Sequence, residues 1–144
     1  MPVFVDTNVL VYSRDTADAA KHATASAWMR RLWETGDGRL SIQVLQEYYV
    51  TTTRKLRPGL PKDVARADVD DLVAWRPVVI DADGLQVAWS VEDRFGLSFW
   101  DSLIVAAAHV AACEVLLTED LQHEADFDGV RALDPFRSSV DDVP

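Results

Sequence analysis

Short apolar segments alternate along this chain with longer segments of helical periodicity, and this alternation is the feature that most constrains the fold. The apolar segments are candidates for buried strands, and the helical stretches between them have about ten or more residues. Strands joined by such helices form right-handed crossovers into a mainly parallel sheet. The pattern therefore predicts an α/β fold in which helices cover both faces of that sheet.

The pattern also predicts where the elements lie. The expected strands are residues 2–6, 39–43, 78–80, 115–117 and 130–133. The expected helices are residues 17–35, 44–55, 63–75, 83–94 and 98–113. Gly36 and Gly96 are expected helix ends and Ser98 a helix start, while Thr7 and Asn8 are expected to form a turn after the first strand. We assign residues 1–137 to a single domain and expect residues 138–144 to be a frayed acidic C-terminal tail.

Net charge restricts the classes of function. The chain has 14 Lys and Arg residues against 24 Asp and Glu, a net charge of −10. Because Lys and Arg drive nucleic-acid binding by neutralising phosphates, this balance disfavours a general nucleic-acid coat protein. It is compatible with a nuclease whose acidic site is compensated by cations, and with a basic protein partner.

Two further features bear on the compartment. The apolar runs are much shorter than the roughly 20 residues of a membrane span, and no basic stretch precedes an apolar one at the N-terminus. The single cysteine, Cys113, suits a reducing compartment and is expected to be a buried, inert thiol. We expect a cytoplasmic protein without a membrane segment.

Four acids form the candidate site. Asp6 ends the first strand and Asp120 follows strand 115–117, so both are expected at the carboxyl edge of the sheet, where such folds bind ligands. Glu47 and Asp101 also stand beside apolar segments, where an isolated carboxylate is costly unless it is paired, protonated or bound to metal. Each acid also has an ordinary structural explanation, as a helix cap, an exposed helix residue or a turn former.

Asp101 has the strongest such alternative, because Ser98 three residues earlier forms a helix-capping pattern with it. However, Ile104, Val105 and Ala108 follow at helical spacing, so Asp101 shares a face with apolar side chains rather than with solvent. The helix N-terminus also favours its ionised form, which a metal ligand requires.

Clustered carboxylates repel one another, which makes a divalent cation their natural partner. Mg²⁺ or Mn²⁺ fits best, because both prefer oxygen ligands, whereas zinc calls for His or Cys. The three histidines, His22, His109 and His123, form no pair with ligand spacing. A cation held in this way lowers the pKa of an attacking water and suits phosphodiester hydrolysis.

The same residues carry a resemblance to a known family. The segments concerned are Val3–Asn8, Glu47, Phe99–Ile104 and Leu116–Leu121. In order and spacing they resemble the successive motifs of PIN-domain nucleases, and within that family the VapC-type toxins of toxin-antitoxin pairs. The resemblance spans nearly the whole chain and implies a PIN-like three-layer sandwich with endoribonuclease activity that depends on Mg²⁺ or Mn²⁺.

That resemblance also implies roles and partners. Asp6, Glu47, Asp101 and Asp120 would bind the metal, with Asn8 and Thr118 as supporting polar residues. The toxins of this family usually form homodimers and are neutralised by a small cognate antitoxin, often through a basic segment of the antitoxin. Many relatives have Gly soon after the last acid, where this chain has Glu124, so Glu124, Asp126 and Asp128 remain alternatives to Asp120.

A basic cluster suggests where RNA binds. Glu47, Thr51 and Arg54 recur at helical spacing and are expected to face the same way. Arg54 would then lie at the rim of the metal site, where Arg54 and Lys55, together with Arg57, would contact RNA phosphates. The alternative is a solvated helix end at which the helix dipole favours cations.

Three other functions stay open at this point. The first is a PIN-type nuclease of RNA maturation without a toxin role. The second is an acidic phosphotransfer fold, although Asn8 stands where a haloacid-dehalogenase-like phosphatase has its second aspartate. The third is a catalytically silent protein-binding module in which the acids only cap helices.

Overall fold

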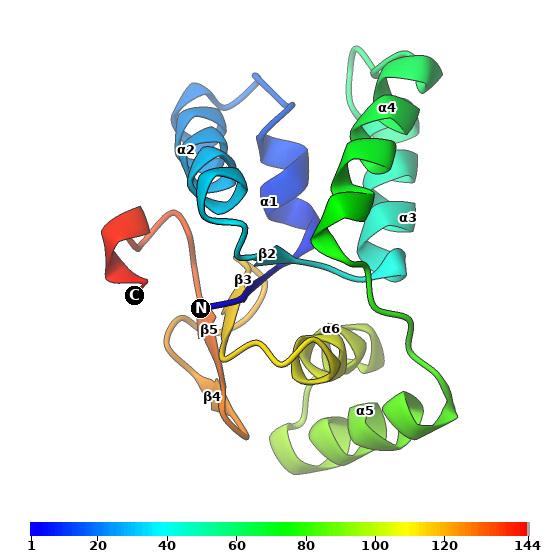
Figure 1. The fold of residues 1–144 in the computed structure, drawn as a ribbon, viewed down its shortest axis with the longest axis vertical. Coiled ribbons are helices and arrows are strands. Elements are labelled where there is room, and N and C mark those ends of the chain that lie inside the picture. Colours follow the sequence, from blue (N-terminus) through cyan, green and yellow to red (C-terminus); the bar gives the residue numbers. More distant parts are fainter. Residues whose placement is uncertain (144) are drawn as a thin grey trace.

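A five-stranded sheet forms the centre of the computed structural model, which describes residues 1–143 (Figure 1). The strands are β1 (Val3–Val5), β2 (Gly38–Arg39), β3 (Val115–Leu117), β4 (Asp126–Phe127) and β5 (Val130–Leu133). Their order is β2-β1-β3-β5-β4, and all neighbours are parallel except β4 and β5. Val5 pairs with Leu117, so β1 and β3 end side by side at the same edge of the sheet.

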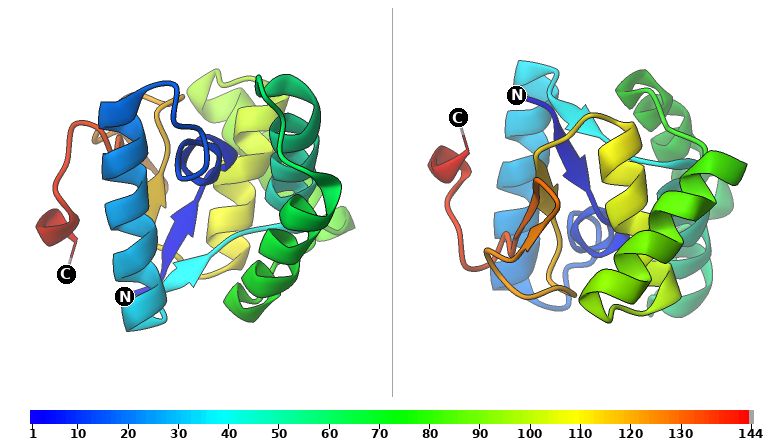
Figure 2. Two further views of the ribbon diagram at one scale, coloured as in Figure 1. Left: turned by 90° about the horizontal axis from the view of Figure 1, so that it is seen from above. Right: turned by 90° about the horizontal axis from the view of Figure 1, so that it is seen from below.

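Helices cover both faces of this sheet. They are α1 (Thr7–Tyr12), α2 (Ala19–Thr35), α3 (Ile42–Val50), α4 (Lys62–Leu72), α5 (Ala82–Phe95) and α6 (Phe99–Val110). α1 and α2 lie on one side of the sheet and α6, backed by α5, on the other, while α3 and α4 form an arm beyond β2 (Figures 1 and 2). The predicted three-layer α/β fold with a mainly parallel sheet is confirmed.

Helix ends follow the sequence signals. Gly36 and Gly96 adopt left-handed conformations, with φ of 72° and 66°, and end α2 and α5. Ser98 precedes α6, and its hydroxyl accepts a hydrogen bond from the backbone N–H of Asp101 at 3.1 Å. These three predictions are confirmed.

Two strand predictions are wrong in extent or in kind. The strand expected at residues 39–43 ends at Arg39, because the Ser41 hydroxyl accepts from the Val44 N–H at 3.2 Å and so caps α3. The strand expected at residues 78–80 is absent from the part of the chain that the structure describes. Val78 forms only an isolated bridge with Ser41, because α3 begins at Ile42 and leaves no longer strand with which residues 78–80 could pair. Val79 is accordingly 67% exposed.

Some elements were not expected. The turn after β1 opens directly into α1, and a short antiparallel strand, β4, pairs with β5 around Gly129. The helix expected at residues 44–55 is α3 followed by a wider π-helical turn, Thr51–Lys55. Helix α4 is likewise extended by a 3₁₀ turn, Val73–Trp75.

Two features concern the core and the C-terminal segment. Cys113 is buried, as expected, and its burial raises the pKa of the thiol to about 12. The segment 138–144, for which we expect a frayed tail, contains a 3₁₀ turn at Val140–Asp142, and Val143 is buried. Residue 144 lies outside the described residues. None of the helices within residues 1–143 has the length and apolarity needed to span a bilayer.

Candidate active site

Asp6 is the only acidic residue in the buried part of the protein within residues 1–143, with 6% of its surface exposed. It lies where β1 passes into α1, and its backbone N–H donates to the Leu117 carbonyl of β3 at 3.0 Å. One carboxylate oxygen, Oδ1, accepts from the Thr7 N–H at 2.7 Å and caps α1. The other, Oδ2, accepts from the Thr118 hydroxyl at 2.8 Å. Asp6 is therefore a helix cap through Oδ1, as its structural alternative predicts, while Oδ2 is held by Thr118 at the end of β3.

The environment of Asp6 disfavours its charged form. Burial is the main cause that raises its pKa, the hydrogen bonds from Thr118 and Thr7 lower it, and the charges of Asp120 and Glu47 raise it, with a net pKa of about 7. A buried carboxyl group with this pKa is half-protonated at neutral pH. A positive charge placed beside it would lower this pKa and favour the ionised carboxylate.

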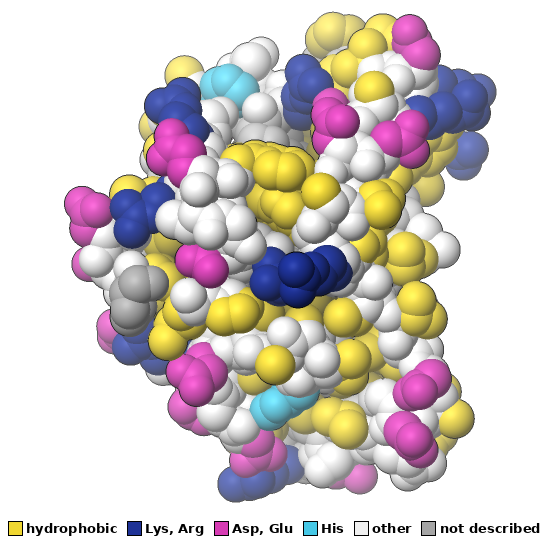
Figure 3. Space-filling view, in the orientation of Figure 1, with side chains coloured by type: hydrophobic (Ala, Val, Ile, Leu, Met, Phe, Trp, Pro, Cys, Tyr) yellow, Lys and Arg dark blue, Asp and Glu magenta, His cyan; other side chains and the backbone are white. Residues whose placement is uncertain are grey.

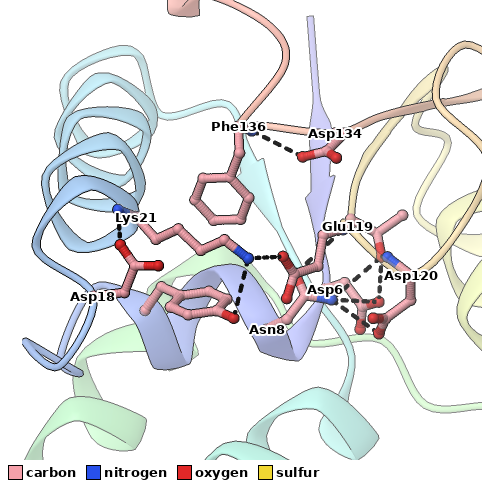
Figure 4. Close-up of polar contacts among 10 residues, drawn as sticks. Asp6, Asn8, Asp18, Lys21, Glu119, Asp120, Asp134 and Phe136 are labelled. Carbon is pink, nitrogen blue, oxygen red and sulfur yellow. Dashed lines mark hydrogen bonds and ion pairs between the residues drawn. The ribbon is translucent and has the colours of Figure 1, made fainter.

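Asn8 links the acids of β1 and β3 (Figure 4). Its side-chain amide donates to Asp120 Oδ2 at 3.0 Å and lies 3.4 Å from Asp6 Oδ2. The same amide donates to the Thr118 hydroxyl oxygen at 3.3 Å, which also accepts the Asp120 backbone N–H at 3.1 Å. Asn8 and Thr118, expected as supporting residues, thus hold two carboxylates on one side of the site.

The charge of Asp101 acts on Asp120. Partial burial raises the pKa of Asp120, the charges of Asp101, Glu119 and Glu47 raise it further, and the Asn8 amide opposes the rise. Asp101 lies in the first turn of α6. Within residues 1–143 its carboxylate accepts no hydrogen bond from the Ser98 N–H, so the cap of α6 uses the Ser98 hydroxyl and leaves the Asp101 carboxylate without a capping role.

Glu47 approaches the cluster from the arm. Its carboxylate accepts from the Thr7 hydroxyl at 2.8 Å and from the Gln43 side chain at 2.9 Å. Thr7 therefore connects Glu47 to the helix that Asp6 caps. The charges of Glu47 and Asp120 raise the pKa of Asp6, and those of Asp101 and Glu47 raise the pKa of Asp120, so the four acids lie in one region of the molecule.

The alternative acids lie elsewhere and have other partners. Asp126 accepts from the Gly129 N–H at 2.8 Å within the β4–β5 hairpin, and Asp128 forms an ion pair with Arg94. Glu124 is exposed. Among the acids that follow β3 within residues 1–143, Asp120 is the one whose carboxylate accepts a hydrogen bond from the Asn8 amide, which favours it as the fourth member.

Sequence reasoning missed a cation beside the cluster. Lys21 of α2 donates to Glu119 Oε2 at 2.8 Å, and its ammonium lies 4.9 Å from the centre of the Tyr12 ring and 5.0 Å from that of Phe136 (Figure 4). The hydrogen bond to Glu119 raises the pKa of Lys21. The Glu119 backbone N–H in turn lies 3.5 Å from Asn8 Oδ1. No sequence signal marked Lys21, because its position depends on where α2 packs.

The expected alignment of Glu47, Thr51 and Arg54 is not realised. Thr51 lines a hollow of about 320 Å³ next to Asn8 and Asp120, whereas Arg54 lines a separate groove between α3 and α4. The expectation assumed α-helical spacing, and the π-helical turn at Thr51–Lys55 breaks that spacing. Contact of Arg54 and Lys55 with RNA stays a prediction.

The cluster fits a divalent cation in its chemistry. Every charged ligand candidate is a carboxylate, which matches the oxygen preference of Mg²⁺ and Mn²⁺. Within residues 1–143 no three acid, imidazole or thiol groups converge into a ready-made metal cage. Three of the four acids are instead held by a polar neighbour, Asp6 by Thr118, Asp120 by Asn8 and Glu47 by Thr7.

Comparisons with known proteins agree with this geometry. The profile of the PIN domain family matches residues 3–127. Among solved structures, the chain is similar to VapC20 of Mycobacterium tuberculosis, a toxin that cleaves the sarcin-ricin loop, with 26% sequence identity and a TM-score of 0.62. That match covers 82% of this chain and 91% of the VapC20 chain. A search of curated proteins returned no match.

Proposed function

This chain belongs to the PIN-domain family, and from that premise we propose that it is an endoribonuclease of the VapC toxin type that hydrolyses RNA phosphodiesters with a divalent cation. The observation that carries the proposal is the acid cluster at the carboxyl edge of the sheet. There, the Asn8 amide is shared between the carboxylates of Asp6 and Asp120. A helix-capping role for the acids gives no reason for this sharing.

Asp6, Asp101 and Asp120, with Glu47, would hold Mg²⁺ or Mn²⁺. A cation bound there supplies the charge that lowers the pKa of an attacking water and neutralises the phosphate. Asp6 would release its proton on binding, since only the ionised carboxylate is a ligand. Asn8, Thr7 and Thr118 would keep the carboxylates oriented.

We propose the partners on the likeness to VapC20 and on the family. As a toxin, the chain would act in the cytoplasm, where its RNA substrate is, and would be neutralised by a cognate antitoxin. A basic antitoxin segment would suit the net charge of −10. We also propose that the chain forms a homodimer, which gel filtration with light scattering tests.

Cleavage of RNA by the purified protein tests the activity. The substrates are hairpin RNAs, including the sarcin-ricin loop, with Mg²⁺ or Mn²⁺ and with EDTA as the metal-free control. Asp101→Asn should abolish cleavage, while Asp93→Asn, which alters an exposed acid of α5 outside the cluster, should leave it intact. Cleavage that survives Asp101→Asn or EDTA would contradict the proposal.

The toxin role needs a separate measurement. Induced expression of the unaltered chain should arrest growth, and expression of Asp101→Asn should not. If the unaltered chain cuts RNA but induction leaves growth unaffected, the nuclease proposal stands and the toxin role is refuted.

A further inference from the structure

The tip of the α3–α4 arm is positively charged, whereas the chain as a whole is negatively charged. Residues 51–67 contain a single acid, Asp63, and five basic residues: Arg54, Lys55, Arg57, Lys62 and Arg66. This segment, which we call the basic tip, therefore has a net charge of +4, whereas the rest of the chain has −14. Five of the 14 basic residues of the chain thus lie in one segment of net positive charge, which is the kind of segment that binds phosphates.

The structure gathers these side chains at one end of the arm. The π-helical turn is closed back onto the loop by a hydrogen bond of 2.8 Å from the Leu60 N–H to the Thr52 carbonyl. Across the arm, the Arg66 guanidinium of α4 lies 5.7 Å from the centre of the Tyr49 ring of α3. Arg54 and Arg66 line the same groove, and basic side chains are visible around this end of the molecule (upper right in Figure 3).

These cations are not neutralised within the protein. All five are exposed, and none forms an ion pair with a carboxylate among residues 1–143. The helix dipole accounts for Arg54 and Lys55, which end the π-helical turn. It does not account for Lys62, because a cation at the first residue of a helix is disfavoured.

The basic tip also adjoins the acid cluster. Thr51 lines the hollow beside Asn8 and Asp120, and the turn that begins at Thr51 ends at Lys55. Thr51 and Lys55 are thus the two ends of a single five-residue turn. A chain of phosphates held at the tip would therefore continue toward the acids.

We propose that the basic tip is the docking surface for the phosphate backbone of the RNA substrate, next to the site of cleavage. The inference rests on the proposed function and adds to it the surface that offsets the repulsion between RNA and an acidic protein. Arg57, Lys62 and Arg66 join Arg54 and Lys55 in this role. RNA fits this surface because its phosphates carry the negative charge that five exposed cations without carboxylate partners attract.

Binding of a labelled hairpin RNA, followed by fluorescence anisotropy, tests the inference. All proteins would carry Asp101→Asn to suppress cleavage, and the dissociation constant would be measured over a series of salt concentrations. The test variant is R54Q/K55Q/R57Q. The matched control is R30Q/R131Q/R137Q, which removes three exposed arginines outside the tip and changes net charge equally.

The test variant should bind at least about tenfold more weakly, and its slope of log affinity against log salt should fall by about two, since each lost phosphate contact removes about 0.7 to 0.9. The control should bind like its Asp101→Asn parent, and thermal unfolding would verify that both variants fold. An unchanged slope in the test variant overturns the inference, as does an equal loss in the control, which would indicate a net-charge effect. The first of these results would be expected if the tip binds an acidic protein instead.

Failure of the inference and failure of the proposed function remain distinguishable. If the unaltered chain cuts RNA but the test variant keeps its salt slope, only the docking surface is refuted. If the unaltered chain cuts no RNA with either metal, the proposed function fails, whatever the tip binds.

Discussion

Asp6→Asn provides a direct test of the electrostatics of the cluster. The pKa of Asp6 is about 7 in the folded protein against an ordinary value of 3.8. Between these values the folded state retains a proton that the unfolded state has released, so stability falls as pH rises. The contribution of the protonated Asp6 carboxyl group to the free energy of unfolding is fully present below about pH 4 and is lost as the pH rises through 7. At about 1.4 kcal/mol per pH unit, the unaltered chain should lose about 3 kcal/mol between pH 5 and pH 8 from this group alone.

Urea unfolding in EDTA at pH 5, 6, 7 and 8 measures the effect. Asn cannot ionise, so the stability of Asp6→Asn relative to the unaltered chain should increase by about 3 kcal/mol over this range. Taking the difference between the two proteins removes the contribution of every other titrating group that the substitution leaves unperturbed. Asp93→Asn is the control for the loss of one acid, because Asp93 is exposed and its carboxylate accepts no hydrogen bond within residues 1–143; it should not reproduce the rise in relative stability expected for Asp6→Asn.

Adding Mg²⁺ or Mn²⁺ at pH 8 completes this test. A ligand that binds only the folded state stabilises it, so the cation should raise the stability of the unaltered chain more than that of Asp6→Asn. A flat difference between pH 5 and pH 8 would show that Asp6 keeps an ordinary pKa and would refute the burial argument. Equal stabilisation of both proteins by the cation would refute Asp6 as a ligand.

Three further predictions concern other parts of the molecule. Asn8→Ala should lower kcat/KM for RNA and the affinity for Mn²⁺ by about 10- to 100-fold with the fold retained, because the amide orients the acids; unchanged Mn²⁺ affinity would contradict this. Gly38→Ala should lower the free energy of unfolding by about 1 to 3 kcal/mol, since an added Cβ would lie 2.5 Å from the Trp75 ring, and an unchanged urea midpoint would refute that packing. Cys113 should react with a thiol reagent at pH 8 only as fast as the protein unfolds, because burial raises its pKa to about 12 and hides it; rapid reaction in the folded state would contradict the burial.

Much of the sheet and of the acid cluster was predictable because the signals are local. An apolar run that closes on an acid identifies both a buried strand and the residue at its carboxyl end, as for Val3–Val5 with Asp6 and for Val115–Leu117 before Asp120. Parallel pairing of Val5 with Leu117 then brings these ends together. No tertiary information beyond the topology was needed for this step.

Local patterns failed where packing decides the structure. Residues 78–80 have the composition of a strand, yet the early start of α3 at Ile42 leaves Val78 with a single bridge. The π-helical turn at Thr51–Lys55 likewise cannot be recognised from periodicity, and it moves Arg54 from the rim of the acid cluster to the groove on the arm. Arg54 and Lys55 do lie at the end of the helical segment, as the sequence indicates, but Arg54 faces the groove between α3 and α4 rather than the acid cluster.

The choice between Asp120 and its neighbours shows why the fourth acid was undecided. Asp120, Glu124, Asp126 and Asp128 all follow β3, and although Asp120 is nearest to the strand, the sequence does not show which of the four turns back to the edge of the sheet. The difference lies in the backbone that follows β3. Thr118 is held to β5 by its N–H, which donates to the Leu133 carbonyl at 3.0 Å, and its hydroxyl accepts the Asp120 N–H, so Asp120 stays at the edge where β1 ends. The β4–β5 hairpin gives Asp126 and Asp128 partners of their own, Gly129 and Arg94, which leaves Asp120 as the acid that shares the Asn8 amide with Asp6.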